Sequence, residues 1–267
     1  ASGLFTGRDL AQSFRRRGRC AFDSGQLKGY ISIMFGYANP AKFMRLSGKL
    51  LPVTAVLAAL CIATGLYLGF AAPPDYQQGR TVLIMFVHVP SVLVAELAYG
   101  VIAVASLFSM VQRHLLADVA ARAAAPLGAL FTVLGLITGS LWGRPMWGTY
   151  WAWDPRLTSF LLLLFLYIGY MALWNAIEDE VKAARAAAIL ALVGAVDLPI
   201  IFFSVKWWNS LHQGESIISG AIAPVFLWPL LAMILGYGLL FATLLMMRIR
   251  TGILNRRARA LMQRAAA

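Results

Sequence analysis

Charged residues are scarce in this chain of 267 residues: Asp, Glu, Lys and Arg make up 13 % of it, and 60 % is hydrophobic. Soluble domains usually carry about 25 % charged residues. The shortage excludes an ordinary soluble domain and predicts an integral membrane protein. The formal net charge of +12 would suggest a nucleic-acid partner in a soluble protein. We expect no nucleic acid here, because Lys and Arg in membrane proteins set the orientation of the loops.

Cysteine is nearly absent as well. Cys20 lies in the basic N-terminal region and Cys61 in the first apolar run, so we expect no disulfide between them. No CxxC or CxxCH motif occurs, which excludes a thiol redox pair and a site for covalent haem attachment. There is no Walker A pattern, so an ATP-driven step would belong to a partner. With no catalytic constellation either, the sequence predicts a protein that is not an enzyme.

What the chain does contain is long apolar runs. Each is about 20 residues or more, the length that crosses the hydrocarbon as a helix. The fold class predicted is an all-α integral membrane protein with six transmembrane helices. The runs lie near residues 50–70, 82–111, 123–141, 157–177, 186–205 and 224–248. The domains predicted are a partly disordered basic segment (1–49), a six-helix membrane domain (50–250) and a basic tail (251–267).

Lys and Arg are distributed unevenly around these runs. Nineteen lie in the N-terminal segment, the C-terminal tail and the two connections near 112–122 and 178–185, and four lie in the other three loops. The side rich in Lys and Arg is cytoplasmic by the positive-inside rule, so both termini are predicted inside. The loops predicted outside are residues 71–81, 142–156 and 206–223.

Tryptophan is concentrated in one of the outer loops. Four of the eight Trp residues fall within residues 142–153, and this predicts a Trp-rich loop between the third and fourth helices. Indoles offer flat apolar faces and one N–H donor, which suits a flat apolar ligand with polar edges. The alternative is an interfacial aromatic belt, but a belt spreads its aromatics over several helix ends. The candidate binding residues are Trp142, Trp147, Tyr150, Trp151, Trp153 and Asp154.

Only three His residues occur, and two lie on the same predicted face as the Trp-rich loop. His88 is near the outer end of the second helix and His212 is in the third outer loop, whereas His114 is in an inner loop. Neutral imidazole is a good iron ligand, so His88 and His212 are candidate axial ligands of one haem. Zinc is disfavoured, because no Cys or carboxylate cluster accompanies the pair. The alternative is that His88 hydrogen-bonds inside the bundle and His212 is solvated.

Charged side chains beside these groups have candidate roles. Arg144 and Arg156 are the nearest partners for haem propionates, because a guanidinium binds a carboxylate through two hydrogen bonds. Asp154 is expected to orient the loop by accepting N–H groups or to pair with Arg156, since a buried carboxylate needs donors. Glu96 and Asp197 lie inside apolar runs and must face the bundle, a cavity or a partner helix. No function is predicted for these two.

Several segments resemble a known family over about residues 50–250. The segment Trp147–Thr158 resembles the tryptophan-rich "WWD" signature of the haem-handling proteins of cytochrome c biogenesis. Together with other short segments it resembles haem exporter protein C, the CcmC family. Those segments are Tyr76–Gly79, His88–Pro90, Trp142–Gly148, Leu198–Ile201 and Trp207–Gly214. Tyr150 and Pro155 depart from the usual pattern of the signature.

The resemblance implies a multi-pass protein of the bacterial inner (plasma) membrane, with a mitochondrial inner membrane left open. It implies haem b, held without covalent bonds at the periplasmic face and presented to the haem chaperone CcmE. CcmD and the transporter subunits CcmA and CcmB are the other implied partners. In that family the two outer His are the axial ligands and the Trp-rich loop is the haem platform. Here the ligands would be His88 and His212, and the platform would be Trp147, Trp151, Trp153 and Asp154.

Two other function classes stay open. A haem-containing electron-transfer subunit with two b haems usually needs four His on its helices, and this chain has three in total. A subunit that moves haem through its own bundle needs a polar path across the membrane. Glu96, Asp197 and the Ser and Thr positions are the candidates for such a path.

The charge distribution makes the topology testable. Reporter fusions after residue 148 should be active in the periplasm, and fusions after residue 180 should be active in the cytoplasm, because the basic connections stay inside. The activities of paired periplasmic and cytoplasmic reporters measure this. The opposite pattern would place His88, His212 and the Trp-rich loop on the wrong side of the membrane for delivery to an outer acceptor.

Overall fold

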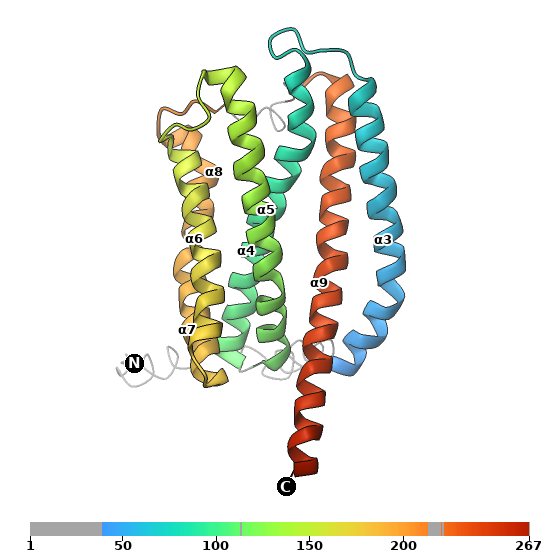
Figure 1. Ribbon diagram of the computed structural model, residues 1–267, viewed down its shortest axis with the longest axis vertical. Helices are drawn as coiled ribbons and strands as arrows, with labels where there is room; N and C mark the ends of the chain where they lie inside the picture. Colours follow the sequence, from blue (N-terminus) through green and yellow to red (C-terminus); the bar gives the residue numbers. More distant parts are fainter. Residues whose placement is uncertain (1–38, 113, 213–219, 221, 267) are drawn as a thin grey trace, which may run out of the picture. The chain divides into compact units, whose positions relative to one another are not determined.

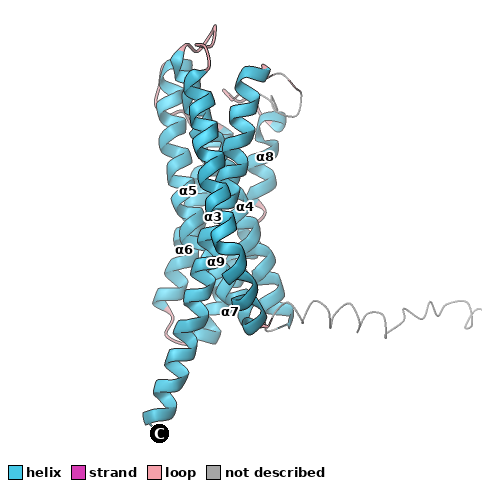
Figure 2. Ribbon diagram, turned by 90° about the vertical axis from the view of Figure 1, so that its right-hand side faces the viewer, coloured by secondary structure: helices cyan, strands magenta, loops and turns pink. Residues whose placement is uncertain are grey.

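The computed structural model describes residues 39–112, 114–212, 220 and 222–266. The chain divides into two compact units, residues 1–43 and 44–267, and the helical bundle below belongs to the second. Within the described residues the regular elements are all helical, and the only β pairing is an isolated bridge between Asp75 and Gly79 (Figure 2).

Six segments of the described chain are long and apolar enough to cross a membrane, as predicted. A lipid environment favours this architecture, because a helix satisfies its backbone hydrogen bonds internally. The elements in chain order are α3 (Pro40–Ala71), the 3-10 helix η1 (Arg80–Ile84), α4 (Met85–Gln112), α5 (Leu115–Trp147), α6 (Pro155–Ala176), α7 (Glu180–Gly194), α8 (Asp197–Trp207) and α9 (Pro224–Ala266).

Several helices are longer than the apolar runs. α9 continues to Ala266, and α5 reaches Trp147, so Trp142, Arg144 and Trp147 lie on the last turns of a helix and not in a loop as expected. An apolar run ends at the first polar residue, whereas a helix ends where its backbone is capped. Here Gly148 caps α5 with a φ of 77°, a conformation that glycine adopts without strain. The loop between α5 and α6 is therefore only residues 148–154.

The fifth membrane span is interrupted near its middle. α7 ends at Gly194 and α8 begins at Asp197, with a turn between them. Pro199 lies in the first turn of α8, where its missing N–H withholds one hydrogen bond from the preceding turn. The pair still forms one membrane span, Glu180–Trp207, and the predicted number of six is confirmed.

The main core lies where α4, α5, α6 and α7 meet. Tyr167 of α6 is fully buried and donates a 2.6 Å hydrogen bond to the carbonyl of Ala95 on α4. Its ring packs edge-on against Tyr99, with centroids 5.2 Å apart. Small residues let the helices approach closely around these rings, as in other membrane bundles. The alanines buried in this cluster are Ala95, Ala98, Ala105, Ala121, Ala124, Ala125, Ala183, Ala187 and Ala191.

The bundle has two distinct ends (Figure 1). One end carries the α3–η1 connection, the α5–α6 loop and the chain that follows α8. The other carries the connection between α6 and α7 and the C-terminal end of α9, which extends beyond the neighbouring helices. The sequence placed His88, His212 and the four tryptophans of residues 142–153 together at one end, and the fold brings them to the first.

The close contact between α5 and α6 yields a stability prediction. A methyl group at Gly128 would collide with the buried phenol ring of Tyr167, whereas a methyl at Gly100 would meet nothing within 4 Å. Gly128→Ala should therefore lower the free energy of unfolding by about 1–3 kcal/mol, the usual cost of overpacking. Gly100→Ala should keep or raise it, because Ala favours a helix. Thermal unfolding in detergent compares the two, and equal midpoints would contradict the packing.

Candidate functional site

Asp154 begins helix α6. Its Oδ1 accepts the backbone N–H of Arg156 at 2.9 Å and of Leu157 at 3.4 Å, the arrangement of an N-cap. Pro155, which departs from the usual signature, is the first residue of the helix, where its fixed φ and missing N–H are favourable. The expected role of Asp154 as an acceptor of N–H groups is met by the backbone and not by indoles.

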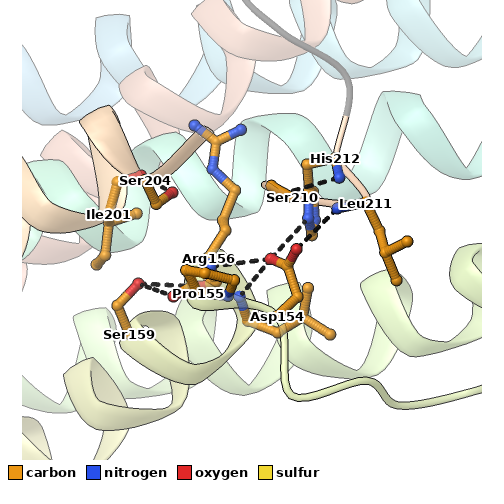
Figure 3. Close-up of polar contacts among 10 residues, drawn as sticks. Asp154, Pro155, Arg156, Ser159, Ile201, Ser204, Ser210, Leu211 and His212 are labelled. Carbon is orange, nitrogen blue, oxygen red and sulfur yellow. Dashed lines mark hydrogen bonds and ion pairs between the residues drawn. The ribbon is translucent and has the colours of Figure 1, made fainter. Parts of the chain in front are cut away.

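The same carboxylate holds the segment that follows α8. Its Oδ2 accepts the backbone N–H of Leu211 at 2.8 Å, and its Oδ1 lies 3.3 Å from Nδ1 of His212 (Figure 3). Burial raises the pKa of Asp154, but hydrogen bonds from the Ser210 hydroxyl and from the backbone of Leu211 and Arg156 outweigh it and keep that pKa below its usual value. Asp154 is therefore an ionised, nearly buried carboxylate that joins the start of α6 to the segment that follows α8.

His212 is packed between this carboxylate and an indole. Its ring centroid lies 4.8 Å from that of Trp147, at an interplanar angle of 63°. Burial lowers the pKa of His212 to about 4, although the Asp154 carboxylate opposes the shift, so the imidazole is neutral at pH 7. Nδ1 faces Asp154 without the alignment of a full hydrogen bond. With the proton on Nδ1, the lone pair lies on Nε2.

His88 is held by α5 in a comparable way. Its Nδ1 lies 3.1 Å from the carbonyl oxygen of Gly135 and 3.1 Å from the hydroxyl of Thr138. That hydroxyl donates to the Leu134 carbonyl at 2.7 Å, so Nδ1 carries the proton and donates to Gly135. Gly139 leaves room for the ring, because a Cβ there would lie 2.9 Å from Cε1 of His88.

The two imidazoles thus present the same nitrogen. In each, Nδ1 faces an acceptor of the protein, and Nε2 has no hydrogen-bond partner among the described residues. A His that ligates a metal almost always gives its other N–H to a carboxylate or carbonyl; Nδ1 of His88 has such a carbonyl and Nδ1 of His212 lies 3.3 Å from such a carboxylate. His88, His212 and Arg156 also lie within electrostatic reach of one another. The structure therefore brings the two sequence-predicted ligands into one site.

Arg156 and Arg144 occupy different surroundings. The Arg156 side chain extends away from the Asp154 carboxylate, so the pairing considered from the sequence does not form (Figure 3). No carboxylate of the described residues lies within 4.0 Å of its guanidinium. The Arg144 guanidinium instead donates to the carbonyl of Gly148 and lies 5.6 Å above the Tyr150 ring. Arg156 is the better placed of the two for an anionic ligand group.

The tryptophans divide into an inner and an outer pair. Trp142 packs edge-on against His88, with centroids 5.7 Å apart, and Trp147 contacts His212. Trp151 and Trp153 pack against each other at 5.6 Å in the loop, and the Trp153 side chain is 78 % exposed. The inner pair thus shapes the surroundings of the imidazoles, and the outer pair forms a surface open to a ligand or a partner.

Sequence reasoning missed the residues that support the imidazoles. Gln78 accepts a 2.9 Å hydrogen bond from the indole N–H of Trp142, which ties the α3–η1 connection to α5. Thr138 was not predicted because its partner lies 50 positions away in the chain. A third aromatic group, Trp207 stacked on Phe203 at 5.2 Å, was also overlooked, although adjacent tryptophans at 207 and 208 were a visible signal.

Glu96 and Asp197 remain without a function. Asp197 is buried at the start of α8, and neither of its carboxylate oxygens has a hydrogen-bond partner among the described residues. Glu96, on α4, is partly buried and lies within electrostatic reach of Asp197 and Arg156. Both face the bundle, as the sequence required.

The side chains available as metal ligands decide which cofactor the site can bind. The described residues contain no group of three or more His, Cys, Asp or Glu that could hold a bare metal ion. Two imidazoles alone suit an iron whose other four ligands come with it, as in a porphyrin. The flat indoles match the faces of such a ring. The guanidinium of Arg156, which has no carboxylate partner in the described chain, matches its propionates. The fold and site thus define a six-span membrane protein with a paired-His, aromatic site at one end of the bundle.

Comparison with known proteins gives the family. The sequence model of CcmC, heme exporter protein C, matches residues 33–264. A heme exporter protein C of Bradyrhizobium diazoefficiens is 55 % identical over 227 residues, which cover 84 % of this chain and 86 % of the relative. One from Escherichia coli strain K12 is 46 % identical over 81 % of this chain and 89 % of the relative. The chain belongs to the heme exporter protein C family, and the resemblance seen in the sequence is confirmed.

The double role of Asp154 can be tested against a matched carboxylate. Asp179 caps α7 in the same way, accepting the N–H groups of Val181 and Lys182, but it holds no second segment. Asp154→Ala should cost about 1 kcal/mol for the cap and about 1–3 kcal/mol for the orphaned Leu211 N–H. It should also speed amide exchange at residues 208–212, measured by hydrogen–deuterium exchange. Asp179→Ala should leave that exchange unchanged, and equal exchange in both variants would argue against the link.

Proposed function

We propose that this protein binds haem b without covalent attachment at the end of the bundle that carries His88 and His212, and that these two residues are the axial ligands of its iron. The observation that carries the proposal is the shared orientation of the imidazoles, each with Nδ1 beside a protein acceptor and with no hydrogen-bond partner for Nε2 among the described residues. Family membership supports it, because the relatives are named heme exporters.

Each neighbouring side chain then has a defined task. Asp154 orients His212 and keeps its proton on Nδ1, while Gly135 does the same for His88. Arg156, which has no carboxylate partner in the described chain, binds a haem propionate. The indoles of Trp142, Trp147, Trp151 and Trp153 and the Tyr150 ring give the flat apolar contact. Arg144 positions Tyr150 and is not a second propionate ligand.

The bound haem is cargo for delivery, and the protein is not an enzyme. We place it in the bacterial inner membrane with the haem site at the periplasmic face, where it presents haem to the chaperone CcmE for maturation of c-type cytochromes. CcmD and the transporter subunits CcmA and CcmB are its proposed partners. The 19-to-4 distribution of Lys and Arg supports this orientation. The exposed Trp153 and Tyr150 give an acceptor direct access to the cargo.

Delivery requires that one axial ligand be released first, and His212 is the better candidate. His88 is part of helix α4 and can move only with the helix, whereas His212 follows the end of α8 and is held through Asp154 and Trp147. Segments outside helices open at a lower free-energy cost than packed helices. We therefore propose that the acceptor displaces His212 while His88 and Arg156 still hold the cargo.

The ligand assignment is tested by the absorption spectrum of the haem-loaded protein. His88→Gly or His212→Gly should convert a six-coordinate low-spin spectrum into a five-coordinate high-spin one, and added imidazole should restore it by filling the space left by the side chain. His114→Gly is the matched control, since that residue precedes α5 at the other end of the bundle. A low-spin spectrum that persists in both site variants would exclude these ligands.

The aromatic surface is tested separately from the ligands. Trp153→Leu should reduce haem retention by about fivefold to a hundredfold, using the roughly 1–3 kcal/mol of base stacking on an aromatic ring as the scale. The haem that remains should still be low-spin, because both His are intact. Trp228→Leu, an exposed indole on α9, is the control. Haem content is measured by the pyridine haemochrome method. Equal retention in the two variants would indicate that the loop is an interfacial aromatic belt and not a haem-binding surface.

A further inference from the structure

A cavity lies at the other end of the bundle, where α5, α7 and α9 approach one another. Its volume is about 290 Å³. Gly252 of α9 permits this approach, because a Cβ there would lie 2.7 Å from Cγ1 of Val119 on α5. The side chains that matter for its chemistry are Arg122, Glu180, Arg248, Thr251, Arg256 and Arg259.

The cavity is strongly basic. Four arginines line it and Glu180 is its single carboxylate, so the lining carries a net charge of three positive. Glu180 pairs with Arg259 at 3.3 Å and with Arg256 at 3.9 Å. The lining holds no second carboxylate for Arg122 and Arg248, whose guanidinium groups each carry five N–H donors. This excess of donors around a cavity favours an anion with several oxygen acceptors.

The two remaining arginines are fixed by the helices. Nε of Arg248 donates a 3.0 Å hydrogen bond to the carbonyl of Ala123, which leaves its terminal N–H groups for other acceptors. The Arg122 guanidinium lies 4.8 Å above the Trp174 ring. Arg122 and Arg248 are therefore held at the cavity by packing and backbone contacts, so an anion would find a preformed site.

The position of the cavity along the helices indicates that the anion belongs to a membrane lipid. Residues 224–247 of α9 carry no charge and Arg248 is the first charged residue after them; on α5, Arg122 precedes the uncharged residues 123–143. Both arginines therefore mark the same boundary between hydrocarbon and water, the level of lipid phosphates. Met247 and Val181, next in sequence to Arg248 and Glu180, expose apolar side chains that suit acyl chains.

We propose that this cavity binds the phosphodiester headgroup of an anionic phospholipid. The phosphate oxygens accept hydrogen bonds from Arg122, Arg248 and Arg256, and the acyl chains run along the apolar faces of α5 and α9. Basic cavities between membrane helices bind anionic headgroups in this way. The site is independent of the haem site at the opposite end.

The test uses the full-length protein in detergent, with phosphatidylglycerol as the probe and the thermal midpoint as the readout. The double variant Arg122→Gln/Arg256→Gln should raise the lipid concentration for half-maximal stabilisation by about tenfold or more, since each Arg near an anionic headgroup contributes about 1 kcal/mol. The double variant Arg257→Gln/Arg264→Gln removes the same charge from α9 outside the cavity lining and should bind like the unmodified protein.

A further variant is expected to change the lipid affinity in the opposite direction, which distinguishes a lost contact from misfolding. Glu180→Gln removes the carboxylate that competes for Arg256 and Arg259, so it should tighten phosphatidylglycerol binding, which damage to the fold would not do. Equal affinity in the two double variants, or phosphatidylcholine binding as well as phosphatidylglycerol, would overturn the proposal. Inorganic phosphate that displaces the lipid at comparable concentrations would overturn the lipid assignment and identify a site for a free anion.

Discussion

The end of the bundle that carries His88 and His212 depends on one buried carboxylate. Asp154 is 5 % exposed, and its oxygens accept N–H groups from the start of α6 and from Leu211, which lies 57 positions away. A buried carboxylate is stable only when donors surround it, so each partner fixes the others. The start of α6, the end of the Trp-rich loop and the position of His212 follow from this single set of hydrogen bonds.

The second constraint is the close approach of α4 and α5. Gly139 makes room for the His88 ring, and Gly135 supplies the carbonyl that accepts its Nδ1–H. An imidazole that donates through Nδ1 keeps the lone pair of Nε2 for a metal. Nδ1 of His212 faces a carboxylate and Nδ1 of His88 faces a backbone carbonyl, so both imidazoles keep Nε2 for a metal. That agreement between the two residues is the strongest structural support for a shared ligand.

Much of the fold could be predicted because the membrane imposes simple rules. A stretch of about 20 apolar residues can satisfy its backbone only as a helix, so six runs gave six spans. The helix ends could not be predicted from apolarity, because α5 ends at the left-handed backbone of Gly148 and α6 begins where the Asp154 side chain accepts backbone N–H groups. Glycine is typical of helix C-termini and aspartate of helix N-termini, but the length of an apolar run depends on neither.

The candidate site could be predicted in part. His88, His212 and the tryptophans were selected by scarcity and by their common face. Gln78 lies 64 positions from Trp142, Thr138 lies 50 positions from His88, and Leu211 lies 57 positions from Asp154, so only the folded structure brings these partners together. The roles of the two arginines were separable only in three dimensions, since Arg144 is engaged by Gly148 while Arg156 has no carboxylate partner in the described chain.

The central claim is that the two imidazoles, each oriented through Nδ1, bind opposite faces of one haem. A cryo-electron microscopy map of the haem-loaded protein tests it most directly. The account predicts iron between Nε2 of His88 and Nε2 of His212, with Asp154 still beside Nδ1 of His212 and the Arg156 guanidinium at a propionate. Haem held elsewhere in the bundle, or iron bound through only one of these two residues in the resting state, would contradict it.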